Sequence, residues 1–413
     1  MLLSSKSPFS VLQHKNFRLL WLGLLISRIG SEMQVVAINW HVYLLTHSAL
    51  SLSIIGLARF LPLLIFSLFS GILADTFNRK KLLLIANIIT TLTAALLSLA
   101  TFSHHISTAL IYLMLAINSL ATSFEIPVRQ SLLPYLVPKE KFMSAVSLTT
   151  IMFQTATVLG PAIVGFTIAF WGVGTVYLVN ALSFFAVIIA ILLMDPVNQP
   201  STHGNSFQIS RVLEGLSFVR KTPIISGTMI LDFFATFFSS AQVLMPVFAK
   251  DILKVGAQGL GFLYAASAIG SILAGFIISF SGRLKNQGKI MLVAVTIYGL
   301  SITLFGLSRS FYLSLFFLLL SGLGDGLSTI LRNAIRQLAT PDHLRGRMVS
   351  INQIFFIGGP QLGEVEAGLV AGFVNTPFAV ISGGIATILT TITLTFLVPQ
   401  IRRYQGHEHL EIV

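Results

Sequence analysis

The stretch Gly71–Lys81, which reads GILADTFNRKK, decides the fold. It lies between two long apolar runs, about 52–74 and 82–102, and is predicted to be the short turn that joins two membrane-spanning helices. A carboxylate and three cations in so short a turn are unusual, because only 10% of the chain is charged. We expect Gly71 to let backbones approach closely and Asp75 to cap or pair with a neighbouring helix. The cations that follow should lie at the lipid headgroups.

Apolar runs of about 18–25 residues recur along the whole chain, and each is long enough to cross a bilayer as a helix. The chain has 413 residues, is 54% hydrophobic and has a mean hydropathy of +0.87, which excludes a soluble enzyme. We therefore predict an all-α polytopic membrane protein with twelve transmembrane helices. The expected spans are 17–45, 50–74, 82–102, 107–128, 143–169, 174–194, 223–248, 258–281, 289–307, 311–333, 347–372 and 377–398.

The cations are distributed unevenly between the expected loops. The outer loops hold Lys250, Lys254 and Arg309, and the membrane holds Arg28 and Arg59. The remaining 21 of the 26 Lys and Arg fall in segments that are cytoplasmic if both termini are inside, which is the positive-inside pattern of a multi-pass membrane protein. The formal net charge of +12 thus indicates topology, and no nucleic-acid partner is expected.

Four segments are predicted: an N-terminal six-helix bundle at 1–195, a cytoplasmic linker at 196–222, a C-terminal six-helix bundle at 223–398 and a cytoplasmic tail at 399–413. The linker begins with a polar run and continues with apolar residues at helical spacing, which predicts an amphipathic helix on the inner membrane surface. These apolar residues are Ile209, Val212, Leu213, Leu216 and Val219.

Polar side chains repeat on one helix face in the two halves, 203 residues apart. Such a repeat is expected of two similar six-span bundles. We assign both stripes mainly to gating, with substrate contact as the alternative. The matching positions are Asn118 and Ser321, Thr122 and Asp325, Glu125 and Ser328, and Arg129 and Arg332.

The stretch that decides the fold resembles the loop 2–3 signature, G-x-L-A-D-x-x-x-R-K, of the major facilitator superfamily of secondary transporters. Thr76 stands where a basic residue is usual, and Asn78 where Gly is usual; Asn tolerates left-handed backbone, so the turn is expected to survive. The resemblance implies that Asp75 contacts Arg129 and braces spans four and eleven when the inner side is shut. The matching residues are Gly71, Leu73, Ala74, Asp75, Arg79 and Lys80.

A narrower resemblance is to the branch of that superfamily that holds enterobactin-exporter-like and macrolide-efflux-like proteins. It implies export of amphipathic, siderophore- or drug-like compounds from the bacterial cytoplasm, driven by a proton gradient without a cofactor. Gly160-Pro161 in span five also resembles the antiporter motif of drug exporters. A Gly followed by a Pro predicts a kinked helix that packs closely against its neighbours, here at the pivot between the two halves. The segments that carry the branch resemblance are 37–46, 125–130, 340–347 and 363–368.

Ionisable residues inside the spans are the candidate coupling and substrate-cavity residues, since an uncompensated charge at mid-bilayer costs roughly 3 kcal/mol. Arg28, Glu32 and Asn39 share one face of span one. The pair of Arg28 and Glu32 either neutralises itself or opens when substrate or a proton arrives. Asp232 in span seven has no cation within a turn, so burial favours its protonated form, as a proton carrier requires; the alternative is a neutral Asp that hydrogen-bonds to a neighbouring helix.

Span eleven and span two complete this set. Glu364 shares a face with Gln353, whereas Glu366 points elsewhere, so the two acids are not expected to line one cavity. Gly358-Gly359-Pro360 can kink the helix and so change which of these residues share a face. Arg59 can attract an anionic substrate or pair with one of the acids.

The hypothesis from sequence is a monomeric exporter in which protonation of Asp232, Glu32 or Glu364 releases a small amphipathic substrate outward. An importer or a lysolipid flippase on the same fold is one alternative, and a non-transporting membrane receptor or scaffold is another. No metal site is expected, because neither His104-His105 nor the tail histidines have a third ligand nearby. No cysteine and no nucleotide-binding P-loop occur in the sequence.

Overall fold

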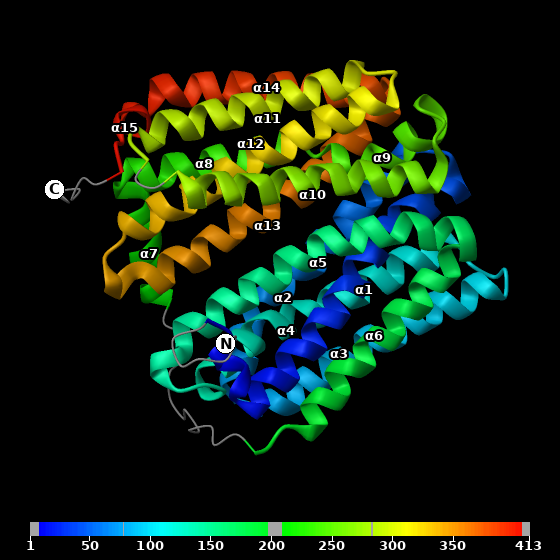
Figure 1. Ribbon diagram of the computed structural model, residues 1–413, viewed down its shortest axis with the longest axis horizontal. Coiled ribbons are helices and arrows are strands. Elements are labelled where there is room, and N and C mark those ends of the chain that lie inside the picture. Colours follow the sequence, from blue (N-terminus) through cyan, green and yellow to red (C-terminus); the bar gives the residue numbers. More distant parts are fainter. Residues whose placement is uncertain (1–7, 77, 197–208, 282–283, 407–413) are drawn as a thin grey trace. The chain divides into compact units, whose positions relative to one another are not determined.

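The computed structural model describes residues 8–76, 78–196, 209–281 and 284–406 (Figure 1). Every regular element in these residues is helical, which confirms the all-α prediction. They form two compact units. The first consists of Met1–His47 and Ala58–Phe207, and the second of Ser48–Leu57 and Gln208–Val413, within the described ranges.

The first unit contains the helices of the predicted N-terminal bundle, except for the first turns of the second helix. Short 3-10 helices precede the first long helix and connect the fourth to the fifth. Gly23 and Gly30 of α1 let this helix lie directly against α6, because a Cβ at either position would lie 3.0 Å or less from α6 atoms. The long helices are α1 (Lys15–Thr46), α2 (Ala49–Thr76), α3 (Arg79–Phe102), α4 (Thr108–Leu132), α5 (Phe142–Trp171) and α6 (Val173–Leu193).

The turn between α2 and α3 is shorter than predicted, because α2 continues to Thr76 and therefore includes Gly71 and Asp75. Asn78 does not adopt the left-handed conformation that its replacement of Gly suggested. Its φ is −62° and its ψ is 114°, and its side chain accepts a hydrogen bond from the Lys81 N–H at 3.2 Å. Asn is therefore favoured here as the N-cap of α3.

The second unit begins with the amphipathic helix predicted in the linker. This helix docks on α13: a Cβ at Gly215 would lie 2.9 Å from the Cβ of Arg347, and Glu214 forms a 2.6 Å ion pair with Arg347. The α-helices of this unit are α7 (Ile209–Lys221), α8 (Pro223–Phe238), α9 (Met245–Val247), α10 (Gly256–Phe280), α11 (Gln287–Leu307), α12 (Phe311–Leu338), α13 (Asp342–Phe373), α14 (Thr376–Leu397) and α15 (Pro399–Arg403).

The expected span 223–248 is an interrupted helix. After α8 the chain forms a 3-10 turn at Ala241–Leu244, then α9, then a π-helical turn at Phe248–Ile252. Ser240 donates its hydroxyl to the Thr236 carbonyl at 2.7 Å and to the Pro360 carbonyl at 3.1 Å, so it competes with the backbone for helical hydrogen bonds. Pro246 also lacks the N–H that a regular helix needs.

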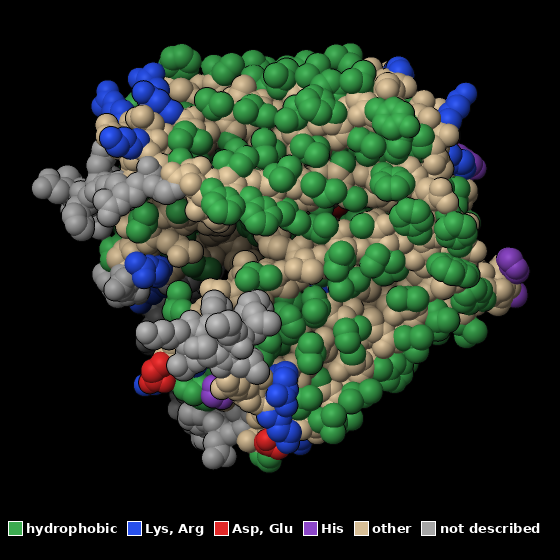
Figure 2. All heavy atoms as spheres, in the orientation of Figure 1, with side chains coloured by type: hydrophobic (Ala, Val, Ile, Leu, Met, Phe, Trp, Pro, Cys, Tyr) green, Lys and Arg blue, Asp and Glu red, His purple; other side chains and the backbone are tan. Residues whose placement is uncertain are grey.

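In the described part of the chain, eleven helical segments are long and apolar enough to cross a membrane. Helix α13, although 32 residues long, is not among them, because it carries several polar residues, including Glu364 and Glu366. Twelve spans and the cytoplasmic placement of both termini therefore stay predictions. Apolar side chains cover the visible flanks of the long helices, whereas Lys and Arg gather at helix ends, as expected of bilayer-spanning helices (Figure 2).

Helix α2 is shared between the units, whereas the predicted boundaries place it wholly in the N-terminal bundle. Its first turns, Ser48–Leu57, belong to the second unit. The reason is close packing on α13: a Cβ at Gly368 would lie 2.6 Å from the Cβ of Ser53, and one at Gly372 would lie 2.2 Å from Leu50. Small residues of this kind allow membrane helices to approach closely.

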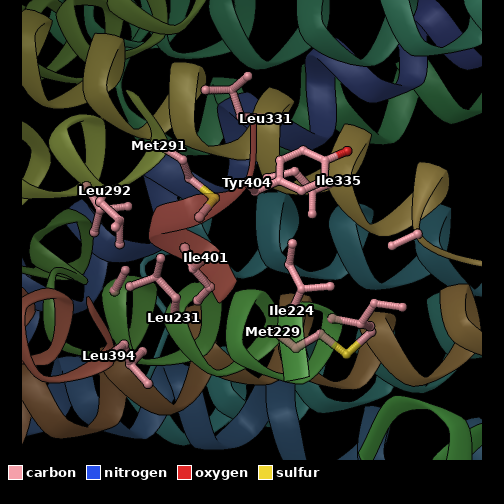
Figure 3. Close-up of a cluster of buried hydrophobic side chains, with 14 of the residues drawn as sticks. Ile224, Met229, Leu231, Met291, Leu292, Leu331, Ile335, Leu394, Ile401 and Tyr404 are labelled. Carbon is pink, nitrogen blue, oxygen red and sulfur yellow. The ribbon is translucent and has the colours of Figure 1, made fainter. Parts of the chain in front are cut away.

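A buried apolar cluster joins α8, α11, α12 and the short C-terminal helix in the second unit (Figure 3). Ile401 and Tyr404, at 0% and 3% exposure, insert among Met291 and Ile335. Gly288 permits this insertion, because its N–H donates to the Tyr404 carbonyl at 3.1 Å and a Cβ there would collide with the Ile401 carbonyl. Residues 399–404 are therefore an integral part of the second unit.

Candidate functional site

A buried carboxylate in the second unit is held by two guanidinium groups from another helix. Asp232 of α8 lies 3.0 Å from Nη2 of Arg332 and 2.8 Å from Nη2 of Arg336, both on α12. The side chains are 4%, 1% and 1% exposed, respectively. Removing one member of such a pair strongly destabilises a protein, because it leaves an uncompensated buried charge.

Arg332 lies between two carboxylates. Its Nη2 is 3.0 Å from Asp232 Oδ1, 3.4 Å from Asp325 Oδ1 and 2.8 Å from the Thr329 hydroxyl. Asp325 is the more accessible acid, with its side chain 37% exposed. The arrangement gives Arg332 an alternative carboxylate without a large movement.

Arg336 connects three helices. It donates to Asp232 and to the Thr228 carbonyl of α8, the latter at 3.1 Å, and also to the amide oxygen of Asn352 on α13. Its Nε donates to the Thr228 hydroxyl at 3.3 Å. One charged side chain thus links α8, α12 and α13. We call Asp232, Asp325, Arg332 and Arg336 the second-unit cluster.

This cluster corrects two expectations. Asp232 is not a carboxyl without a cation, because its cations come from α12, and spacing along its own helix cannot show them. Span ten was expected to end at 333, but α12 continues to Leu338 and buries Arg336. Thr228, Asn352 and Arg336 were therefore missed; the available signal was the four-residue spacing of Arg332 and Arg336, which puts both on one helix face.

The first unit contains a second polar cluster. Arg28 and Glu32 of α1 form an ion pair of 2.7 Å, and Glu125 and Arg129 of α4 form one of 2.9 Å. Both guanidinium groups lie against the ring of Phe153 on α5, at 5.4 Å for Arg28 and 4.7 Å for Arg129. We call these five residues the first-unit cluster. Phe153 was missed in the sequence, where nothing distinguishes it among 33 phenylalanines.

Gly160 of α5 leaves room for the Glu32 side chain between α1 and α5. A Cβ at Gly160 would lie 2.5 Å from the Cβ of Glu32 and 3.0 Å from the Ile29 carbonyl, so the backbones of α5 and α1 meet there. Phe153 and Gly160 are seven residues apart and share one face of α5. Helix α5 runs without interruption through Pro161. The close packing predicted for Gly160-Pro161 is therefore directed at the helix that carries Arg28 and Glu32.

The remaining predicted cavity residues lie elsewhere in the described chain. Asn39 is buried in α1, and Arg59 is half-buried in α2. Gln353, Glu364 and Glu366 are half-buried in α13. Helix α2 packs closely on α13 at Glu364, because a Cβ at Gly56 of α2 would lie 3.0 Å from the Cβ of Glu364.

The structure describes only part of the predicted gating segment Gly71–Lys81. Arg79 is 9% exposed and lies 5.4 Å from the centre of the Tyr135 ring, and Lys80 Nζ donates to the Met194 carbonyl at 2.8 Å. These basic residues therefore anchor the start of α3 within the first unit. The surroundings of Gly71 and the side chain of Asp75 are outside what the structure describes, and so is the predicted contact of Asp75 with Arg129.

Two units of long apolar helices form the fold of a multi-pass membrane protein, and solved structures share this fold. A bacterial homologue of the iron transporter ferroportin, in an inward-facing state, matches with a TM-score of 0.70 over 94% of this chain and 99% of that chain, at 16% identity. A bacterial homologue of the human lysosomal transporter Spinster, also inward-facing, matches with a TM-score of 0.69 over 96% and 97%, at 15% identity.

The chain belongs to the family described as transmembrane secretion effectors, which matches residues 6–409. The enterobactin exporter EntS of Escherichia coli O1:K1 / APEC is 26% identical over 95% of this chain and 94% of its own length. EntS of Shigella boydii serotype 18 shows the same identity and coverage. These findings confirm the major facilitator superfamily, its enterobactin-exporter-like branch and a location in the bacterial inner membrane. The family and these relatives are transporters of small molecules rather than enzymes.

Proposed function

We propose that this protein exports an amphipathic small molecule from the cytoplasm in exchange for protons, by alternating access of its two units. The proposal depends chiefly on the position of Arg332 between two carboxylates. Ionisable groups inside a membrane are retained when they serve transport or proton relay. The export direction and the siderophore-like substrate class are supported by the likeness to proteins named enterobactin exporter.

The second-unit cluster suggests how a proton changes the packing. When Asp232 accepts a proton, its attraction for Arg332 and Arg336 falls, because the neutral acid no longer offsets their charge. Arg332 then shifts toward Asp325, which is 3.4 Å away. The ties between α8 and α12 weaken, and the two helices are free to repack. Return of Asp232 to the charged form restores them.

The first unit has a matching pair of carboxylates. Glu32 and Glu125 are each held by a guanidinium, so protonation of either would release Arg28 or Arg129 in the same way. Glu364 on α13 is a further proposed proton carrier, next to the first turns of α2, where Gly56 approaches it. We propose that the Asp75 segment stabilises the outward-open state, as the family resemblance implies.

Comparative metabolite profiling tests the direction and identity of transport. Cells that lack the protein are expected to retain the substrate inside and to release less of it into the medium than cells that express it. The Asp195→Asn variant should restore release, because the ion pair of the Asp195 side chain with Lys15 is exposed, whereas Asp232→Asn should not. Lower internal accumulation in the absence of the protein would indicate an importer, and an unchanged profile would contradict transport of a metabolite.

A further inference from the structure

Arg28 presents an accessible guanidinium within a membrane-spanning helix. It lies in α1, and its side chain is 45% exposed, whereas that of its ion-pair acid Glu32 is 16% exposed. Charged side chains inside spans almost always face a bundle interior or a water-filled cavity, because exposure to hydrocarbon is costly. A molecule that approaches this ion pair therefore meets the more exposed cation before it meets the acid.

Each group of the first-unit cluster that would attract an organic cation already has a guanidinium against it. Glu32 is paired with Arg28, and Glu125 with Arg129. The face of Phe153, which would attract an ammonium group, has both guanidiniums near it. An entering cation would have to displace an arginine, whereas an entering anion would find an accessible one.

We propose that Arg28 binds an anionic group of the transported molecule, namely a carboxylate or similar planar acid attached to an apolar or aromatic body. This inference rests on the proposed export function and names its substrate class. Glu32 engages Nη2 of Arg28, and a guanidinium has five N–H donors in a fork that matches planar acids. Phe153 lies beneath the guanidinium, and Gly160 holds Glu32 close to α5, so the cation keeps a fixed orientation.

The experiment uses the purified full-length protein in lipid nanodiscs and three probes with one aromatic body: 2-naphthoate, 2-naphthylmethanol and 2-naphthylmethylammonium. Calorimetric titration should show that naphthoate binds at least about tenfold more tightly than the alcohol, as expected of a charge-assisted bidentate contact. The Arg28→Gln variant should remove this preference, and Arg28→Lys should restore part of it. Arg220→Gln is the matched control, because Arg220 is an exposed arginine on α7.

A second variant keeps Arg28 and tests whether the Phe153 ring holds its guanidinium in place. Phe153→Leu retains an apolar side chain but removes the aromatic face, and it should weaken naphthoate binding about threefold. The inference is overturned if naphthoate does not bind, if the ammonium probe binds as tightly, or if Arg28→Gln leaves the naphthoate affinity unchanged. If one of these results is found but the wild-type protein still exports its substrate under a pH gradient, the proposed function stands and only the binding role of Arg28 is wrong. If the wild-type protein prefers naphthoate but transports without a gradient, only the proton coupling is wrong.

Discussion

Asp232→Leu is expected to lower the free energy of unfolding by about 3–5 kcal/mol, because it leaves two buried guanidinium groups without their carboxylate. Chemical unfolding of the purified protein in detergent, followed by circular dichroism, measures this change. Asp195→Asn is the control: it breaks an ion pair whose side chains are 55% and 59% exposed and should change stability by about 0–1 kcal/mol.

Removal of all three charges should recover much of this loss. Buried ion pairs replaced by apolar residues of similar size are often neutral in stability. Asp325, which loses its ion pair with Arg332 in this variant, has a side chain that is 37% exposed, so water can solvate its charge. The triple variant Asp232→Leu, Arg332→Met, Arg336→Met is therefore expected to be more stable than Asp232→Leu alone. If Asp232→Leu is as mild as Asp195→Asn, the carboxyl is neutral in the folded protein, and the ion pairs assigned to it are wrong.

Gly322→Ala is expected to have the second large effect, because it separates α10 from α12. A Cβ at Gly322 would lie 1.8 Å from the Ser267 carbonyl oxygen, and one at Gly270 would lie 2.0 Å from that of Leu319, so each helix contributes a glycine to a direct backbone contact. Overpacking of this kind costs about 1–3 kcal/mol, and backbone atoms cannot move aside as a flexible side chain can. We expect a loss at or above the upper end of that range, measured by thermal unfolding in the same detergent.

Gly275→Ala provides the matched control on α10. Apart from the neighbouring backbone of α10 itself, no described atom lies within 4 Å of a Cβ at this position. The substitution should therefore leave stability unchanged or raise it by about 1 kcal/mol through helix propensity. Equal losses for Gly322→Ala and Gly275→Ala would contradict the close α10–α12 packing, since only one of them meets backbone.

Much of the fold could be predicted from hydropathy and spacing. The long apolar runs are helical in the structure, and the linker residues with apolar side chains at helical spacing form α7. The division of α2 at Leu57 could not be predicted, because it depends on which distant helix Ser53 contacts. The break after α8 was missed for a similar reason: Ser240 donates to Pro360, which is 120 residues away.

The site was predictable only where its members lie on one helix. The ion pairs of Arg28 with Glu32 and of Glu125 with Arg129 follow from four-residue spacing. Asp232 and Arg336 are 104 residues apart, and no local pattern joins them. Helix phase identified which residues share a face, but packing decides which faces meet.

Transport by reconstituted protein under an imposed pH gradient tests the proton-coupling mechanism most directly. Proteoliposomes carry the substrate found by profiling, and its movement is measured for the wild type, Asp232→Asn, Glu32→Gln, Glu364→Gln and the control Asp195→Asn. We expect the wild type and the control to transport only while the gradient is maintained, and at least Asp232→Asn, among the three variants with a neutralised buried acid, to lose gradient-driven transport. Undiminished gradient-driven transport in all three would contradict the mechanism.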